Sequence, residues 1–141
     1  MSLKFKTQIR IKFREADPAQ IMYFANVFSL AHDTFEEFIV AAGYKYREWF
    51  SPNEHLIPIR HVEADYKAPF VPGQTYDVTA TVEHMGSTSF KMKYLFEQNG
   101  RLHATVHMVH AVLDPKTKDK MPLPEIMKQR LSPYLEAPAN V

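Results

Sequence analysis

The sequence predicts an α+β protein in which one long helix packs on the apolar face of an antiparallel sheet of about five strands. Two patterns carry this prediction. Over several segments, apolar and polar residues alternate with a period of two, which is typical of strands buried on one side. One stretch instead spaces its apolar residues as a helix does. Because parallel sheets rarely expose a polar face to water, the alternation indicates an antiparallel sheet.

The first predicted strand covers residues 4–14, with Phe5, Thr7, Ile9, Ile11 and Phe13 on its apolar face. Residues 57–68 form a weaker candidate strand with mixed faces. Three later strands have clear apolar faces, which consist of Tyr76, Val78, Ala80 and Val82, then Phe90, Met92, Tyr94 and Phe96, then Leu102, Ala104, Val106, Met108, His110 and Val112. Asn99-Gly100 separates the last two strands and predicts a tight hairpin.

The long helix is predicted over residues 24–42. Its apolar positions are Phe24, Phe28, Ala31, Phe35, Phe38, Ile39 and Ala42. Gly43 suits the position just beyond the helix, where left-handed backbone is common. A short second helix is expected near Pro124 to Leu131. Residues 1–133 are thus interpreted as a single domain, and the C-terminal tail, residues 134–141, is expected to be loose.

Composition narrows the function. The chain has 141 residues and a formal net charge of +1, which argues against a protein built to hold nucleic acid. It has no cysteine, so disulfides, cysteine-bound zinc and thiol catalysis are excluded. No run approaches the ~18 apolar residues of a membrane span, and the N-terminus lacks the apolar run of a signal peptide. We therefore expect a cytoplasmic protein with no membrane span.

The stretch DPAQIMYFAN, residues 17–26, joins the first strand to the helix. Taken alone, it suits a helix start, with Asp17 as the N-cap, Pro18 at the first helical position and Gln20 closing a capping box. It also carries a carboxylate at the point where a helix begins. The residues alone leave the structural and the chemical interpretation open.

This stretch resembles the loop-to-helix motif of the 4-hydroxybenzoyl-CoA thioesterase-like family of hotdog-fold proteins. The matching residues are Asp17, Pro18, Ala19, Ile21, Tyr23 and Asn26, and the order of elements is similar over residues 4–131. Four positions depart from the family pattern. Gln20 stands where the family prefers glycine, Glu15-Ala16 replaces the usual residues before the motif aspartate, and Phe24 replaces a histidine found in one branch.

The resemblance implies a hotdog fold, with the sheet wrapped around the helix, and an acyl-CoA thioesterase that hydrolyses its substrate to free acid and CoA. By position, Asp17 is the nucleophile or the general base, and the backbone N–H of Phe24 polarises the thioester carbonyl beside Tyr23 of the motif. No cofactor is implied, since coenzyme A is part of the substrate. Such proteins form homodimers or homotetramers with active sites between subunits.

Elementary chemistry agrees with these roles. A carboxylate can attack the carbonyl carbon or take a proton from water, and free N–H groups at a helix start can stabilise an oxyanion. Thiolate leaves readily, so no strong general acid is needed.

Other residues are weaker candidates. Glu37, on the long helix, is the second choice of catalyst. Ser87, Thr88, Ser89 and Lys91 follow a turn and could meet the phosphates of CoA. No metal site is expected, because His103 and His107 lie about 13 Å apart along a strand, and His110 points to the other face.

Two alternatives stay open. One is another hotdog chemistry, a dehydratase or hydratase acting on acyl thioesters, although no histidine lies in the Asp17 loop. The other is a non-catalytic module that binds acyl-CoA. The sequence also leaves open the acyl group, the donor (CoA or an acyl carrier protein) and the choice between dimer and tetramer.

Overall fold

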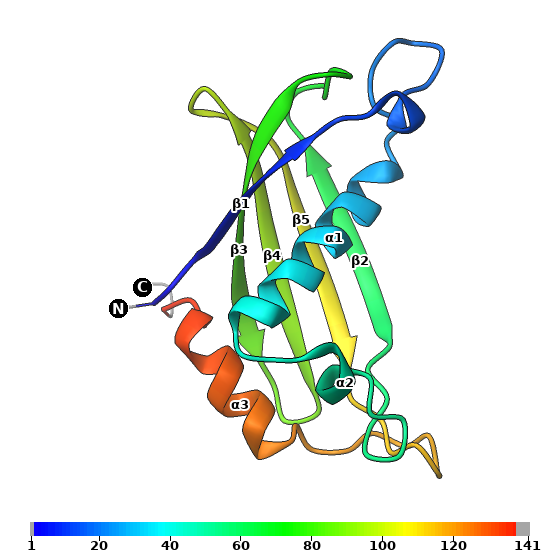
Figure 1. Cartoon of the computed structure of the whole chain (residues 1–141), viewed down its shortest axis with the longest axis vertical. Coiled ribbons are helices and arrows are strands. Elements are labelled where there is room, and N and C mark those ends of the chain that lie inside the picture. The colour runs from blue at the N-terminus through cyan, green and yellow to red at the C-terminus, as the bar shows by residue number, and fades with distance from the viewer. Residues whose placement is uncertain (1, 138–141) are drawn as a thin grey trace.

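The computed structural model describes residues 2–137. Five strands form one antiparallel sheet in the order β1-β3-β4-β5-β2. They are β1 (Phe5–Arg10), β2 (Ile59–Tyr66), β3 (Thr75–Met85), β4 (Ser89–Gln98) and β5 (Arg101–Ala111). The long helix α1 (Asn26–Ala41) crosses one face of the sheet, with α2 (Tyr46–Trp49) and α3 (Glu125–Leu131) near its end (Figure 1). The predicted α+β architecture is confirmed.

The core lies between α1 and the sheet. The residues that α1 buries are Val27, Leu30, Ala31, Thr34, Phe35, Phe38 and Ile39. They meet the alternating apolar residues of β3, β4 and β5, which are buried as the sequence predicts except for Leu102. A bulge in β5 opposite Phe96 and Glu97 buries His103 and leaves Leu102 only partly buried, so the prediction is wrong at that position. Each large side chain buried in this way contributes roughly 1.5–3 kcal/mol relative to an exposed one. The helix is therefore fixed to the sheet along its whole length.

The Asn99-Gly100 turn joins β4 to β5 as predicted. Both residues have positive φ, 51° for Asn99 and 76° for Gly100. These values suit the two-residue turns whose twist matches that of paired strands.

The first strand is shorter than the sequence suggests. β1 ends at Arg10, which pairs with Thr75 at the start of β3. Beyond this point β3 offers no partner, and η1 (Phe13–Glu15), a 3-10 turn, begins. Phe13, expected on the buried face, is 87% exposed, so that part of the prediction is wrong.

The long helix also begins later than predicted, at Asn26, so that Phe24 lies in the turn before it. Its end agrees with the prediction. Gly43 has φ 112°, and its N–H donates to the carbonyl of Val40 at 3.1 Å. Positive φ is the conformation that favours glycine after a helix.

The C-terminal segment is partly held. The predicted second helix is α3, and it leads into η2 (Ser132–Tyr134). The Tyr134 ring packs edge-on against Phe38 at 4.9 Å, and the N–H of Glu136 donates to the carbonyl of Val82 at 2.8 Å. For residues 134–136 the expectation of a loose tail is wrong, and residues 138–141 lie outside the described part. None of the helices in residues 2–137 is long and apolar enough to cross a membrane.

Candidate functional site

Residues 15–23 form a small hairpin rather than the start of a helix. Ala16 and Met22 pair as an isolated antiparallel bridge, and the N–H of Asp17 donates to the carbonyl of Ile21 at 3.0 Å. Gln20 completes the turn with φ 66°, a left-handed conformation that glycine adopts at less cost. Gln20 thus holds a backbone conformation suited to the glycine that the family prefers at this position.

Asp17 lies at the end of this hairpin with its side chain half-buried. Its Oδ1 accepts the N–H of Ala19 at 2.8 Å, which closes a local turn. Within residues 2–137, no hydrogen bond engages Oδ2. The helix begins nine residues later, and Ala25 is its N-cap. The interpretation of Asp17 as a helix cap is therefore wrong, and one carboxylate oxygen is available for chemistry.

The turn before α1 directs the Phe24 N–H outward. The carbonyl of Tyr23 belongs to the same peptide plane and accepts the N–H of Asn26 at 3.0 Å. Because the N–H and C=O of a trans peptide point in opposite directions, the Phe24 N–H faces away from the helix. It has no acceptor among the described residues. A free donor at this place is compatible with the oxyanion role that the resemblance implies for the Phe24 N–H.

One carbonyl ties the hairpin to the helix. The backbone oxygen of Glu15 accepts both the N–H of Tyr23 and the side-chain Nδ2 of Asn26, each at 2.8 Å. Glu15 is itself buried, and its carboxylate accepts the N–H of Lys12 at 2.8 Å and pairs with Arg14 at 2.9 Å. The strand before Asp17 and the turn that carries the Phe24 N–H are thereby held at one place.

Tyr66 is a member of this site that the sequence analysis missed. Its hydroxyl donates to the carbonyl of Phe24, which connects the last residue of β2 to the turn before α1. Burial raises the pKa of the Tyr66 hydroxyl to about 12, so it remains a donor at neutral pH. Only its place at the end of a weak strand pattern could have singled it out.

Several large apolar side chains of the loop are exposed. Tyr23 and Phe24 lie with their ring centroids 4.8 Å apart, and Phe24 is 61% exposed. Ile21 and Phe13 are exposed on the same segment. Exposed apolar residues that gather in this way mark a surface that meets a ligand or another protein.

The neighbouring edge of the sheet is open. β2 pairs with β5 on one side only, and seven of its eight residues are exposed. On the side facing α1, Val62 and Tyr66 are 39% and 41% exposed. An antiparallel sheet normally buries such residues on its helix-covered face. The edge therefore presents both unpaired backbone groups and apolar side chains.

Glu37 does not lie near Asp17 within one chain. It lies on the exposed face of α1, eleven residues beyond Asn26. At 1.5 Å per residue this separation is about 16 Å along the helix. The structure therefore does not bring together the two candidate catalysts of one chain.

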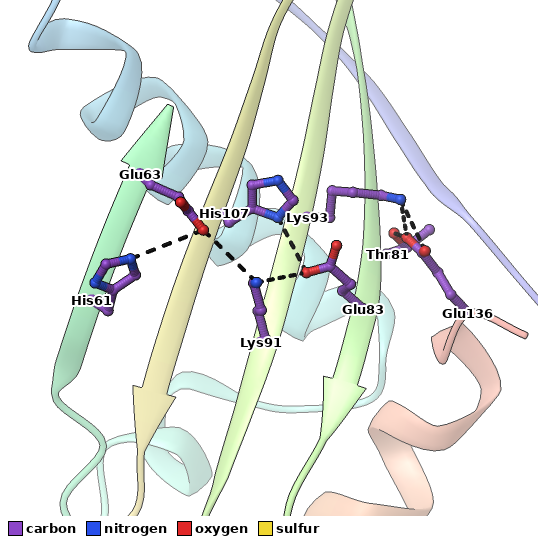
Figure 2. A network of polar contacts seen from close by, with 8 residues as sticks. All are labelled: His61, Glu63, Thr81, Glu83, Lys91, Lys93, His107 and Glu136. Carbon is purple, nitrogen blue, oxygen red and sulfur yellow. Dashed lines mark hydrogen bonds and ion pairs between the residues drawn. The ribbon is translucent and has the colours of Figure 1, made fainter. Parts of the chain in front are cut away.

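The residues proposed to bind CoA lie at the other end of the sheet from the Asp17 loop (Figure 1). Lys91 is already paired, with Glu83 at 3.1 Å and Glu63 at 3.8 Å, on the sheet face opposite α1 (Figure 2). The carbonyls of Ser87 and Thr88 accept backbone N–H groups of residues 123 and 112. Ser89 begins β4. Within one chain these four residues and Asp17 form no common site.

Metal binding finds no support in the described residues. No group of three or more His, Asp or Glu side chains in residues 2–137 is placed to hold a metal ion. His103 bonds the carbonyl of Pro69 at 2.9 Å, and His107 pairs with Glu83 at 3.2 Å.

The sequence model described as the Thioesterase-like superfamily matches residues 11–131. A 1,4-dihydroxy-2-naphthoyl-CoA hydrolase from Synechococcus elongatus is 31% identical over 137 residues, which cover 96% of this chain and 98% of that protein. The crystal structure of a 1,4-dihydroxy-2-naphthoyl-CoA thioesterase from Synechocystis has a TM-score of 0.85 at 20% identity, covering 92% of this chain and 96% of that one. A gentisyl-coenzyme A thioesterase has a TM-score of 0.79 at 19% identity, covering 91% of this chain and 99% of that one. These structures confirm the hotdog architecture predicted from the sequence.

Proposed function

The chain belongs to the thioesterase-like superfamily, and we propose that it hydrolyses an aromatic acyl-CoA thioester to the free acid and CoA. The proposal rests on two groups that one short segment, residues 17–24, provides. The carboxylate of Asp17 has one oxygen that no hydrogen bond among the described residues engages, and the N–H of Phe24 faces away from the helix. A relative named as a CoA-thioester hydrolase aligns with nearly the whole chain and supports the same activity.

In the proposed reaction, the carboxylate of Asp17 takes a proton from water as the water oxygen bonds to the thioester carbonyl carbon. The carbonyl oxygen becomes an oxyanion, which accepts the Phe24 N–H. One such donor contributes about 3 kcal/mol of transition-state stabilisation. The carbon–sulfur bond then breaks, and the CoA thiolate recovers the proton. Direct attack by Asp17, followed by hydrolysis of the mixed anhydride, would use the same geometry. Neither route needs a cofactor beyond the CoA of the substrate.

The rings around the loop support an aromatic acyl group. Tyr23 and Phe24 offer exposed aromatic surface beside Asp17. A stacked or edge-on aromatic pair contributes about 0.5–1.5 kcal/mol beyond its apolar area. The relatives named above act on naphthoyl and gentisyl thioesters, which are aromatic.

We further propose that the working unit is at least a homodimer joined through β2. Its open edge can extend the sheet by pairing with the same strand of a second copy. The exposed Val62 and Tyr66 would then be covered. The substrate would lie between two chains, which accounts for an Asp17 loop that is exposed in one chain alone. A cytoplasmic location stays a prediction from the sequence.

Asp17→Asn tests the catalytic role. Asparagine keeps the side-chain oxygen that accepts the Ala19 N–H, so the hairpin should survive, while the base is lost. We expect CoA release from benzoyl-CoA and 2-naphthoyl-CoA, followed with a thiol-trapping dye, to fall by roughly 10²–10⁴-fold. The melting temperature should be unchanged.

Asp119→Asn, in an exposed loop, is the matched control and should keep the full rate. Glu37→Gln tests the second candidate catalyst. A loss of CoA release in this variant alone would assign the catalytic role to Glu37, on α1. Full activity of Asp17→Asn would refute the mechanism. Binding of every thioester by the wild-type protein without CoA release would favour a binding module instead.

A further inference from the structure

Tyr66, the last residue of β2, connects the sheet to the turn that precedes α1 (Figure 1). Its backbone is held by the sheet, because Tyr66 pairs with the buried Ala104 of β5. The N–H of Lys67, the next residue, donates to the carbonyl of His103 at 2.8 Å. The Tyr66 hydroxyl therefore extends from a fixed backbone when it donates to the carbonyl of Phe24.

The Phe24 carbonyl depends on this contact. Among residues 2–137, the only other hydrogen bond to its oxygen comes from the N–H of Val27 at 3.5 Å, which is longer than the ordinary range of about 2.7–3.2 Å. The Phe24 ring is 61% exposed, so packing of the side chain does little to hold the residue. The Tyr66 hydroxyl is thus the main contact that fixes this carbonyl.

The two peptide groups on either side of Phe24 determine where its N–H points. The first is fixed by the N–H of Asn26, which donates to the Tyr23 carbonyl at 3.0 Å. The second contains the Phe24 carbonyl and is fixed by Tyr66. Because peptide groups are planar, only the φ and ψ bonds of Phe24 can rotate between these two points. Release of the second point would let both angles change, and the N–H would move with them.

We propose that Tyr66 is a positioning residue for the hydrolysis: its hydroxyl holds the turn at Phe24 so that the Phe24 N–H meets the oxyanion as it forms. This role rests on the proposed hydrolase activity and adds a residue of β2 to it. Tyr66 acts through Phe24 and takes no part in bond making or proton transfer. Burial raises the pKa of its hydroxyl to about 12, so the donor keeps its proton over the pH range of an assay.

Tyr66→Phe removes the hydroxyl and keeps the ring. We expect kcat for benzoyl-CoA and 2-naphthoyl-CoA to fall by roughly 10–100-fold, because a misplaced donor costs less than the roughly 10²–10³-fold of a donor removed outright. KM should change by less than about twofold, since the oxyanion is absent from the bound substrate. Full kcat in the variant would overturn the proposal, and so would a loss that appears in KM alone.

The pH profile of kcat separates positioning of the donor from an effect on the base. The profile of Tyr66→Phe should be lower than that of wild type and have the same midpoint on its acid side, because the proposed base, Asp17, is unchanged. A shifted midpoint would mean that Tyr66 acts on the base, which would also overturn the proposal.

Tyr46→Phe is the matched control. Tyr46 lies on α2 and is 53% exposed, against 41% for Tyr66, so this variant removes a hydroxyl of similar exposure far from the Asp17 loop (Figure 1). It should keep the wild-type kcat. Both variants should keep the oligomeric state of wild type in gel filtration. An equal loss of kcat in both variants, or a loss in Tyr66→Phe that accompanies a changed oligomeric state, would assign the effect to the fold or the interface and overturn the proposal.

Infrared spectra measure the donor directly and need no turnover. Benzoyl-CoA with an isotope label in its thioester carbonyl is bound to Asp17→Asn and to the double variant Asp17→Asn/Tyr66→Phe. The carbonyl band should lie at higher wavenumber in the double variant, because a misplaced N–H forms a weaker hydrogen bond with the carbonyl oxygen. Adding Tyr46→Phe to Asp17→Asn should leave the band in place. Identical bands with and without the Tyr66 hydroxyl would overturn the proposal.

The two proposals fail separately. If the wild-type protein releases no CoA from any thioester, the hydrolase activity fails. The infrared comparison, made then on the wild-type protein and Tyr66→Phe, would still decide whether the Tyr66 hydroxyl positions the Phe24 N–H against a bound thioester. Failure of the wild-type protein to bind benzoyl-CoA and 2-naphthoyl-CoA would reject both proposals.

Discussion

His110 offers a quantitative test of the core. Its ring is 1% exposed and stacks on Phe35 and Phe90, with centroids at 4.4 Å and 4.8 Å. Its Nε2 is buried without a hydrogen-bond partner among the described residues. Burial, and secondarily the nearby His32, lower the pKa of His110 to about 3. The folded protein therefore holds this imidazole neutral over the whole range from neutral pH down to mild acid.

The sign of the resulting pH dependence follows from linkage. In the unfolded chain a histidine takes up its proton near pH 6.5, whereas folded His110 remains neutral until about pH 3. As the pH falls through this window, the unfolded state alone gains the proton, and the free energy of unfolding drops by about 1.4 kcal/mol per unit. Between pH 7 and about pH 4.5, His110 alone should remove roughly 2–3 kcal/mol.

The perturbation is His110→Phe, which keeps an aromatic ring between Phe35 and Phe90 and removes both the titration and the unpaired nitrogen. Urea unfolding at pH 7 and at about pH 4.5 should show a loss of stability that is roughly 2–3 kcal/mol smaller in the variant than in wild type. Both proteins are compared at one concentration, because oligomer stability depends on it. His84→Gln, at an exposed position, should behave as wild type.

Equal losses in His110→Phe and wild type would refute this reasoning. They would mean that His110 takes up its proton in the folded state, through water or movement of the ring that its complete burial does not allow.

Two further predictions concern β2 and the Asp17 loop. Because the chain has no cysteine, Val62→Cys introduces a single thiol. In the proposed dimer we place the twofold axis between the two Val62 residues, which sets His61 of each copy opposite Glu63 of the other. Val62→Cys should then form a disulfide-linked dimer on mild oxidation, seen on a non-reducing gel, since opposite Cα atoms about 4.5–5.5 Å apart suit a disulfide. Glu63→Cys should link poorly, and the reverse result would move this axis by one residue. Gln20→Gly should raise the free energy of unfolding by up to about 1 kcal/mol, because glycine relieves the strain of φ 66°; a lower urea midpoint would contradict this.

The strands and the core were predictable because local periodicity records which side of an element is buried. β4 and β5 alternate over most of their length, with Leu95 and Val109 as apolar exceptions on the outer face, and the turn between them carries its own signal in Asn99-Gly100. β2 gave a weak signal for a physical reason. Exposed on both faces, it has no buried side to impose alternation.

The start of α1 was mispredicted because tertiary contacts override the local pattern there. Phe24 continues the helical spacing, and Asp17-Pro18 is a common helix start, yet the helix begins at Asn26. The side chain of Asn26 instead bonds the backbone of Glu15, and positive φ at Gln20 turns the chain back. A propensity of a few tenths of a kcal/mol per residue cannot compete with several such hydrogen bonds.

Only the part of the candidate site formed by residues close together in the sequence was predictable. Asp17 and Phe24 lie within eight positions, so one motif could indicate both. Lys91 and its neighbours were assigned from composition, and composition does not reveal which end of a sheet a turn occupies or that Glu83 and Glu63 already pair with the lysine.

The exposed edge of the sheet provides the strongest support for the proposed oligomer. β2 pairs with β5 on one side only, so its other side presents unpaired backbone N–H and C=O groups. On the face toward α1, its side chains Val62 and Tyr66 are 39% and 41% exposed. The hydroxyl of Tyr66 donates to the carbonyl of Phe24, so the end of this edge lies beside the turn with the free Phe24 N–H. Antiparallel pairing of two copies through β2 would satisfy the strand's edge, cover those side chains and place a second chain beside the candidate site.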